Sequence, residues 1–212
     1  LLTVERYVRK SLFLTTRPTD YGEYTDYRYK GDNGLLKESN PQAYTATWYH
    51  YYEIIALANV MLPHIDKVEM SQDRRDFYKG QVYFTKALVY AELGRKWGDC
   101  PIIKEEVEFD PISPSSWVQV IDYAIALASE AERLLPSYSS MTDYKGNAIT
   151  YKSTPNKGAA QALLAHLCAW KAGCKYMAQP EEATYDEQAL WVKADSVCTA
   201  LITSGTYELA NN

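Results

Sequence analysis

The residues with the clearest capacity for chemistry are tyrosines near the start of the chain. Tyr21, Tyr24, Tyr27 and Tyr29 fall within the segment "YGEYTDYRY", in a chain that has 19 tyrosines in all. A tyrosine ring can stack on the C–H face of a sugar, while charged neighbours hydrogen-bond the hydroxyls. These neighbours are Asp20, Glu23, Asp26 and Arg28. We interpret Tyr21, Tyr24, Tyr27, Tyr29 and Arg28 as candidate ligand-binding residues. The alternative is a long loop that packs its tyrosines onto helices.

No set of residues forms a recognisable catalytic site. The acidic segment "KEEVEFD" at 104–110 offers carboxylates for glycoside hydrolysis, but such segments are more often solvated. The motifs G-x-S-x-G, G-x-G-x-x-G and G-x-x-x-x-G-K-[ST] are missing from the sequence. The three histidines are scattered, and the four cysteines lack zinc-site spacing and read as buried free thiols. We therefore predict no catalytic residue, no cofactor and no metal ligand.

Composition limits the class of protein. Apolar residues make up 47% and charged residues 23% of the chain, which is typical of a globular protein. A net charge of −5 argues against nucleic-acid binding, which needs a basic face. No apolar run reaches the roughly 20 residues that span a bilayer. Because the chain starts at Leu1, we expect it to be a piece of a longer protein, with any export signal upstream.

The elements that must position these side chains are helices. Six segments have apolar residues three and four apart, at approximately 3–15, 45–66, 72–97, 114–136, 155–178 and 185–204. Alanine and glycine on the third segment allow close helix contact, so stacked antiparallel hairpins of tetratricopeptide type are expected. The fold class is thus mainly α, in one domain over residues 1–212. Long irregular stretches fall at 16–44 and 141–155, and a small hairpin is expected in the second.

The segment "LGRKWGDCPII" at 93–103 reads as a helix end followed by a corner. Arg95 complements the negative end of the helix dipole, and Gly98 can adopt the left-handed conformation that closes the last turn. Pro101 stops the helix from resuming, Asp99 can accept hydrogen bonds from the backbone, and Trp97 is expected to anchor the corner by burial. We interpret this segment as structural, not as an active site.

This same segment resembles the signature of the SusD/RagB family of outer-membrane nutrient-binding lipoproteins. The family pattern is R-A-L-x-Y-F-x-L-x-R-x-[FY]-G-D-x-P. The residues in its register are Lys86, Ala87, Leu88, Tyr90, Leu93, Arg95, Trp97, Gly98, Asp99 and Pro101. Four further motifs follow the family in order: "WYHYYEIIALANVMLPHID", "WVQVIDYAIALASEAERLLP", "STPNKGAAQALLAHLCAWKAG" and "WVKADSVCTALITSGTYEL". Lys86, Trp97 and Cys100 depart from the usual Arg, Phe or Tyr, and aliphatic residue.

The resemblance implies a non-enzymatic subunit that binds an oligosaccharide or another large nutrient. It also implies a lipid-modified cysteine upstream of Leu1, a location on the outer face of the outer membrane, and a SusC-type TonB-dependent transporter as partner. Family members run to about twice this length or more, so the chain resembles their N-terminal helical part. Two other readings stay open. One is a helical-repeat scaffold that recognises a protein or peptide, and the other is a hydrolase whose carboxylates lie outside this chain.

Overall fold

The computed structural model describes residues 49–104, 112–151 and 153–207, and the chain divides into two compact units, Leu1–Leu57 and Ala58–Asn212. Helix α3, Tyr49–Lys67, crosses the boundary between them. In the described part of the first unit, the α3 residues Tyr51, Ile54 and Ile55 are buried. The predicted helix at 3–15 and the stretch at 16–44 lie outside the described residues, and the single domain over 1–212 stays a prediction.

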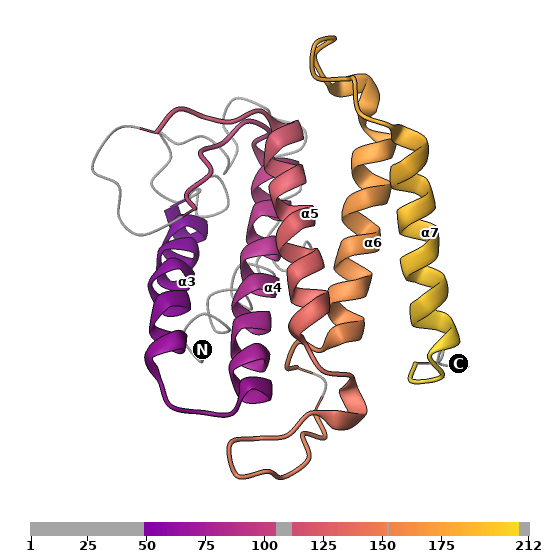
Figure 1. Cartoon of the computed structure of the whole chain (residues 1–212). Helices are drawn as coiled ribbons and strands as arrows, with labels where there is room; N and C mark the ends of the chain where they lie inside the picture. Colours follow the sequence, from indigo (N-terminus) through magenta and orange to yellow (C-terminus); the bar gives the residue numbers. More distant parts are fainter. Residues whose placement is uncertain (1–48, 105–111, 152, 208–212) are drawn as a thin grey trace, which may run out of the picture. The chain divides into compact units, whose positions relative to one another are not determined.

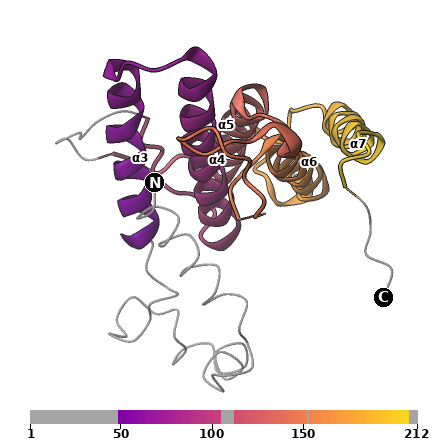
Figure 2. The same ribbon diagram turned by 90° about the horizontal axis from the view of Figure 1, so that it is seen from below.

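The second unit is a row of antiparallel helices (Figure 1). After α3 come α4 (Gln72–Lys96), α5 (Trp117–Leu134), α6 (Lys157–Gly173) and α7 (Glu187–Thr203). Helix α4 packs on α5, α5 on α6, and α6 on α7. Figure 2 shows these four helices end-on in chain order. The predicted mainly α fold of stacked helical hairpins is confirmed. The helix ends lie close to their expected places, except that α6 ends at Gly173 and not at 178.

Small residues bring α4 and α5 close together. Ala87 and Ala91 on α4 are fully buried, as are Ala124 and Ala128 on α5. A Cβ atom added to Gly94 would lie 2.8 Å from Cδ1 of Ile121, so the glycine is needed at this contact. Alanine and glycine let the backbones approach until larger side chains from the neighbour fill the remaining space.

Polar side chains set where the helices start. Ser71 caps α4, and Ser116 forms a capping box with Gln119 at the start of α5. The side chains of Asn156 and Asp186 cap α6 and α7 by accepting hydrogen bonds from the backbone N–H of Ala159 and Ala189, respectively. Each cap satisfies a backbone N–H that has no partner inside the helix, so local side chains determine where these helices begin.

The expected hairpin at 141–155 is a tight turn with one isolated antiparallel bridge, between Thr142 and Ala148. Gly146 has φ of 85°, and the carboxylate of Asp143 accepts hydrogen bonds from the backbone of Lys145 and Asn147. Arg74 on α4 holds the turn in place by donating to the carbonyl and hydroxyl oxygens of Thr142 and to the carbonyl of Asp143. The contacts with Arg74 therefore hold this turn in place of further backbone hydrogen bonds between two strands.

Beneath this turn lies a cluster of buried apolar side chains that joins α4, α5 and α6 at one end of the stack. Its members are Phe77, Ala131, Leu135, Met141, Ile149 and Ala160. Helix α7 is the last helix of the row. Ala194 is its one buried residue, so this helix has a neighbour on one side among the described elements. Within the described residues, no helix is long and apolar enough to cross a membrane.

Candidate functional site

The tyrosine-rich segment lies outside the described residues. This applies to Tyr21, Tyr24, Tyr27, Tyr29 and Arg28, and equally to the acidic residues at 105–110. Their role therefore stays a prediction. The described part of the chain contains no cluster of three His, Cys, Asp or Glu side chains that could hold a metal ion. The candidate sites that remain are the corner after α4, two buried lysines, and charged or aromatic groups at the helix ends.

The corner after α4 positions the start of α5. Gly98 has φ of 75°, the left-handed conformation that the sequence predicts there. The carboxylate of Asp99 accepts a hydrogen bond of 2.8 Å from the backbone N–H of Trp117, the first residue of α5. Cys100 and Ser115 then exchange two backbone hydrogen bonds of 3.0 Å. The corner therefore fixes both ends of the segment between α4 and α5.

Just beyond the corner, Ile103 is held against the helices by side chains. The hydroxyl of Tyr90 donates to the Ile103 carbonyl at 3.2 Å and accepts from the Ile103 N–H at 2.9 Å. Asn59 on α3 also donates to this carbonyl, at 3.3 Å. Tyr90 is fully buried, and its ring lies edge-on to Tyr123 on α5 with centroids 5.1 Å apart. Burial raises the pKa of Tyr90, so its hydroxyl stays protonated and available as a donor.

Lys86 supports the same network from inside α4. Its side chain is 1% exposed, and its Nζ donates to Oδ1 of Asn59 at 2.5 Å. Its Nζ also lies 5.8 Å from the centre of the Tyr123 ring. No ion pair to Lys86 is found among the described residues, and burial lowers its pKa to about 8. This lysine orients the Asn59 amide so that the NH₂ group faces Ile103.

Sequence reasoning missed this buried lysine network, although a signal for it exists. Val82, Lys86, Val89 and Leu93 follow one another at helical spacing, so Lys86 interrupts an otherwise apolar stripe. A cation in the middle of a buried stripe indicates a polar partner on a neighbouring helix. The sequence does not show which partner this is, because Asn59 lies on a different helix.

A second buried lysine fixes the turn between α6 and α7. Lys171 is 2% exposed, and its Nζ lies 2.5 Å from Oδ1 of Asp122 and 4.2 Å from the centre of the Tyr185 ring. The Tyr185 hydroxyl donates to the carbonyl of Lys171 at 3.0 Å, and Lys175 donates to the Tyr185 carbonyl at 2.8 Å. The polar groups of these side chains are therefore engaged in holding the turn, and we interpret the cluster as structural.

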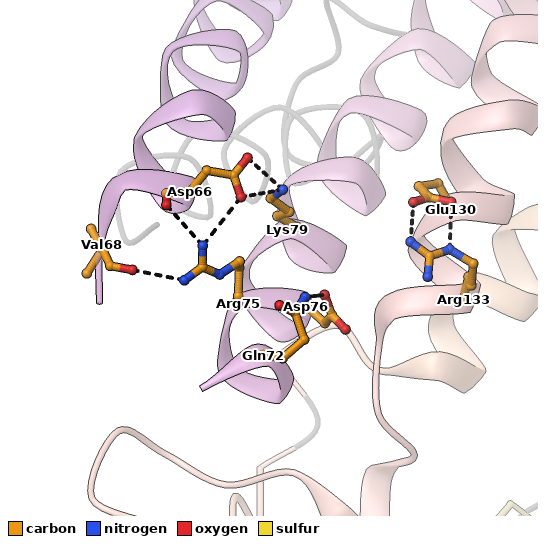
Figure 3. Close-up of polar contacts among 8 residues, drawn as sticks. All are labelled: Asp66, Val68, Gln72, Arg75, Asp76, Lys79, Glu130 and Arg133. Atoms are coloured by element: carbon orange, nitrogen blue, oxygen red, sulfur yellow. Dashed lines mark hydrogen bonds and ion pairs between the residues drawn. The ribbon is translucent and has the colours of Figure 1, made fainter. Parts of the chain in front are cut away.

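Charged side chains also gather around the turn between α3 and α4 (Figure 3). Lys79 lies 2.6 Å from the carboxylate of Asp66, and Arg75 donates to the carbonyls of Asp66 and Val68 at 3.0 and 3.2 Å. The hydrogen bond from Lys79 is the main cause that lowers the pKa of Asp66. The figure also shows the contacts between Gln72 and Asp76 and between Glu130 and Arg133, which stay within α4 and α5, respectively. Because these charges pair with one another at the surface, they hold the turn and contribute little more.

Arg95, a residue of the family signature, connects α4 to α6. Its guanidinium lies 2.9 Å from Nε2 of His166 and forms an ion pair with Glu92. Burial lowers the pKa of His166, and the positive charge of Arg95 lowers it further. The imidazole is therefore a neutral acceptor at pH 7. Among the cysteines, Cys100 and Cys168 are buried as predicted, whereas Cys198 is exposed on α7.

Tryptophans lie at one end of the helix row. Trp97 follows α4, Trp117 opens α5, Trp170 lies in the last turn of α6, and Trp191 lies near the start of α7. Because the helices alternate in direction, these four positions share an end of the stack, the upper one in Figure 1. The rings of Trp117 and Trp170 meet edge-on, with centroids 5.4 Å apart.

The sequence of this chain is similar to those of known proteins. A family model described as "Starch-binding associating with outer membrane" matches residues 19–168. SusD-like protein P38 of Formosa agariphila is 31% identical over 113 residues, which are 51% of this chain and 22% of that protein. SusD-like protein P2 of the same organism is 28% identical over 147 residues, which are 68% of this chain and 26% of that protein. The chain thus spans about a quarter of the length of these curated relatives.

Solved structures with the same fold include a SusD-like protein from Bacteroides fragilis, at 19% identity and a TM-score of 0.66. The likeness covers 91% of this chain and 32% of that one. A laminarin-binding SusD-like protein has 20% identity and a TM-score of 0.57, over 73% of this chain and 29% of that one. At these identities the likeness shows the fold alone. The likeness to the Bacteroides fragilis protein extends over nearly the whole chain.

Proposed function

The chain belongs to the SusD-like family, and from this membership we propose that it is a non-enzymatic, cell-surface glycan-binding subunit. It binds an oligosaccharide or another large nutrient and delivers it to a SusC-type TonB-dependent transporter. The observation that carries this proposal is the match of residues 19–168 to a family described as starch-binding and associated with the outer membrane. In this proposal, a lipid group on a cysteine upstream of Leu1 holds the protein at the outer face of that membrane.

The described geometry supports binding without catalysis. The buried polar groups, such as Lys86, Tyr90 and Lys171, are engaged in contacts that hold loops against helices. A stack of packed helices suits a protein that presents a surface to a long ligand, since preformed surfaces lose little conformational entropy on binding. The tyrosine-rich segment, with Tyr21, Tyr24, Tyr27, Tyr29 and Arg28, is proposed as one part of this surface.

The proposal is tested by calorimetric titration of the intact protein with a panel of polysaccharides. The panel includes soluble starch, after the family description, and laminarin, the glycan that one protein of the same fold binds. We expect binding to at least one glycan, without any shortening of the chain. Replacing Tyr21, Tyr24, Tyr27 and Tyr29 together by alanine is expected to weaken this binding. Unchanged affinity in that variant removes the tyrosines from the site.

Stacked helical hairpins also serve as scaffolds for protein recognition, which is the alternative function. Affinity purification from membranes distinguishes the two. Co-purification of a TonB-dependent transporter, together with glycan binding, supports the nutrient-uptake proposal. Capture of a soluble protein without a transporter and without glycan binding supports the scaffold. Release of shorter sugars during the titration supports a hydrolase.

A further inference from the structure

Five aromatic side chains lie at the same end of helices α4 to α7. We define this aromatic edge as Trp97, Trp117, Trp170, Tyr176 and Trp191. Four of these residues lie at successive helix ends, and Tyr176 lies in the 3₁₀ turn Lys175–Met177 that directly follows α6. The edge therefore runs across α4, α5, α6 and α7 at their upper ends in Figure 1.

The edge becomes more accessible toward α7. Trp97, Trp117 and Trp170 are half-buried, whereas Trp191 is 42% and Tyr176 is 84% exposed. Gly173, the last residue of α6, leaves room for Trp191: a Cβ atom there would lie 3.9 Å from its ring. The rings of Trp117 and Trp170 pack on each other, whereas Trp191 and Tyr176 are open to solvent.

Polar groups accompany these rings. Glu187 is exposed and accepts a hydrogen bond from the indole N–H of Trp191 at 3.3 Å. Gln119 lies exposed in the first turn of α5. A surface of flat aromatic faces with carboxylates and amides beside them matches the two sides of a sugar ring, namely C–H faces and hydroxyl edges.

The length of the edge suits a long ligand. Packed helices lie ~8–10 Å apart, so the ends of α4 to α7 together span several such intervals. A single sugar needs one such ring, whereas a polysaccharide can contact several in turn. Other exposed apolar residues of α7, Val192 and Ile202, are aliphatic and offer no flat face.

We propose that the aromatic edge is a binding surface for an extended glycan chain, with Trp191 and Tyr176 as its stacking residues. This inference rests on the proposed function and adds a site to it. The glycan lies across the ends of α5, α6 and α7, with its hydroxyl groups toward Glu187 and Gln119.

The test compares aromatic residues that lie at the opposite ends of the stacked helices. The intact protein is titrated with soluble starch, laminarin and the remaining panel, and then the variants Trp191→Ala and Tyr176→Ala are titrated with the glycan that binds. Tyr144→Ala and Tyr151→Ala are matched controls, because these tyrosines are 77% and 57% exposed near the opposite end of the stack. Thermal unfolding of each variant checks that the fold is kept. Tyr176→Ala removes a side chain with little buried area, so it reports on binding even if Trp191→Ala lowers stability.

We expect each edge variant to bind about five- to tenfold more weakly, which is the loss typical of one stacked ring, and the controls to keep the original affinity. Equal affinity of the edge variants and the unchanged protein overturns the aromatic edge but leaves the proposed function standing. An equal loss in the controls overturns it as well. Loss of transporter co-purification with unchanged glycan affinity shows that the edge contacts a protein, which also overturns the proposal. If the unchanged protein binds no glycan of the panel, the proposed function itself fails.

Discussion

At the scale of single residues, the most unusual group in the structure is Lys86. Its ammonium group is enclosed by Asn59, Tyr123 and the apolar face of α4, without a carboxylate among the described residues. A buried charge without an opposite charge costs stability, and the lowered pKa of Lys86 is the result of that cost. Lys86 orients Asn59 toward Ile103. The lysine therefore lowers the stability of the fold but fixes the position of one loop.

This cost predicts a dependence of stability on pH. The pKa of Lys86 is 10.5 in an unfolded chain and about 8 in the folded protein. Between these values the unfolded chain holds more protons, so the free energy of unfolding rises with pH, by at most ~3 kcal/mol in total. Lys86→Met removes the titrating group. We expect the stability of the unchanged protein relative to Lys86→Met to increase from pH 8 to pH 10, as measured by urea unfolding.

The control for this experiment is Lys104→Met, which removes an exposed lysine close to the same loop. Its stability is expected to follow the unchanged protein across the pH range. Parallel pH profiles for Lys86→Met and the unchanged protein would show that the buried lysine does not titrate between folded and unfolded states.

At the scale of elements, the start of α5 depends on a side chain that lies outside the helix. Asp99 accepts a hydrogen bond from Trp117 N, and its charge lies at the positive end of the helix dipole. We expect Asp99→Ala to lower the free energy of unfolding by about 0.5–2 kcal/mol. Asp99→Asn keeps the acceptor oxygen and loses the charge. Its free energy of unfolding is therefore expected to lie between those of Asp99→Ala and the unchanged protein. Urea unfolding at low salt measures all three proteins, and equal stabilities would exclude a capping role.

The contact between α4 and α5 gives a second prediction at this scale. A Cβ atom at position 94 meets Cδ1 of Ile121, so Gly94→Ala is expected to cost about 1–3 kcal/mol. Ile121→Val removes the atom in conflict, and the glycine substitution is then expected to cost less in that background. Gly173→Ala is the matched control, because a Cβ there makes only an ordinary contact with Trp191. An identical cost of Gly94→Ala with and without the Ile121→Val substitution would contradict the close contact.

Much of this level could be predicted from the sequence. Apolar periodicity placed the helices, and Gly98 and Pro101 marked the end of α4 because their backbone preferences act locally. The pairing of Asp99 with Trp117, or of Lys86 with Asn59, joins residues far apart in the chain and follows from packing. The tyrosine-rich segment was predicted from residue type alone, and no described contact tests it. The aromatic edge was missed because its members share an end of the stack and not a stretch of sequence.

At the scale of the whole molecule, the second unit is a row in which each helix packs mainly on its immediate neighbours. In such a row, stability is close to a sum of local terms. Helices α6 and α7 are also joined by a side chain that lies beyond the end of α7. Tyr207 follows α7, lies against Gly158, and donates a hydrogen bond of 2.6 Å to Asn156 at the start of α6.

This arrangement predicts that distant substitutions act independently. Gly94→Ala affects the contact between α4 and α5, and Tyr207→Phe removes the hydrogen bond between the end of α7 and the start of α6. We expect the double variant to lose the sum of the two single losses, within about 0.5 kcal/mol. Urea unfolding of the four proteins measures the coupling. A coupling above about 1 kcal/mol would mean that the row unfolds as a more tightly linked body than its contacts indicate.

The paired backbone hydrogen bonds between Cys100 and Ser115 have a consequence for how this protein can vary. They join the two ends of the segment between α4 and α5. The packing of the two helices therefore does not depend on how long this segment is. The entropy of closing a loop grows slowly, by about 0.6 kcal/mol for each doubling of length. Insertions between Ile103, which Tyr90 and Asn59 hold, and Ser115 are therefore inexpensive, and the segment can diversify in sequence and size while the helices stay the same.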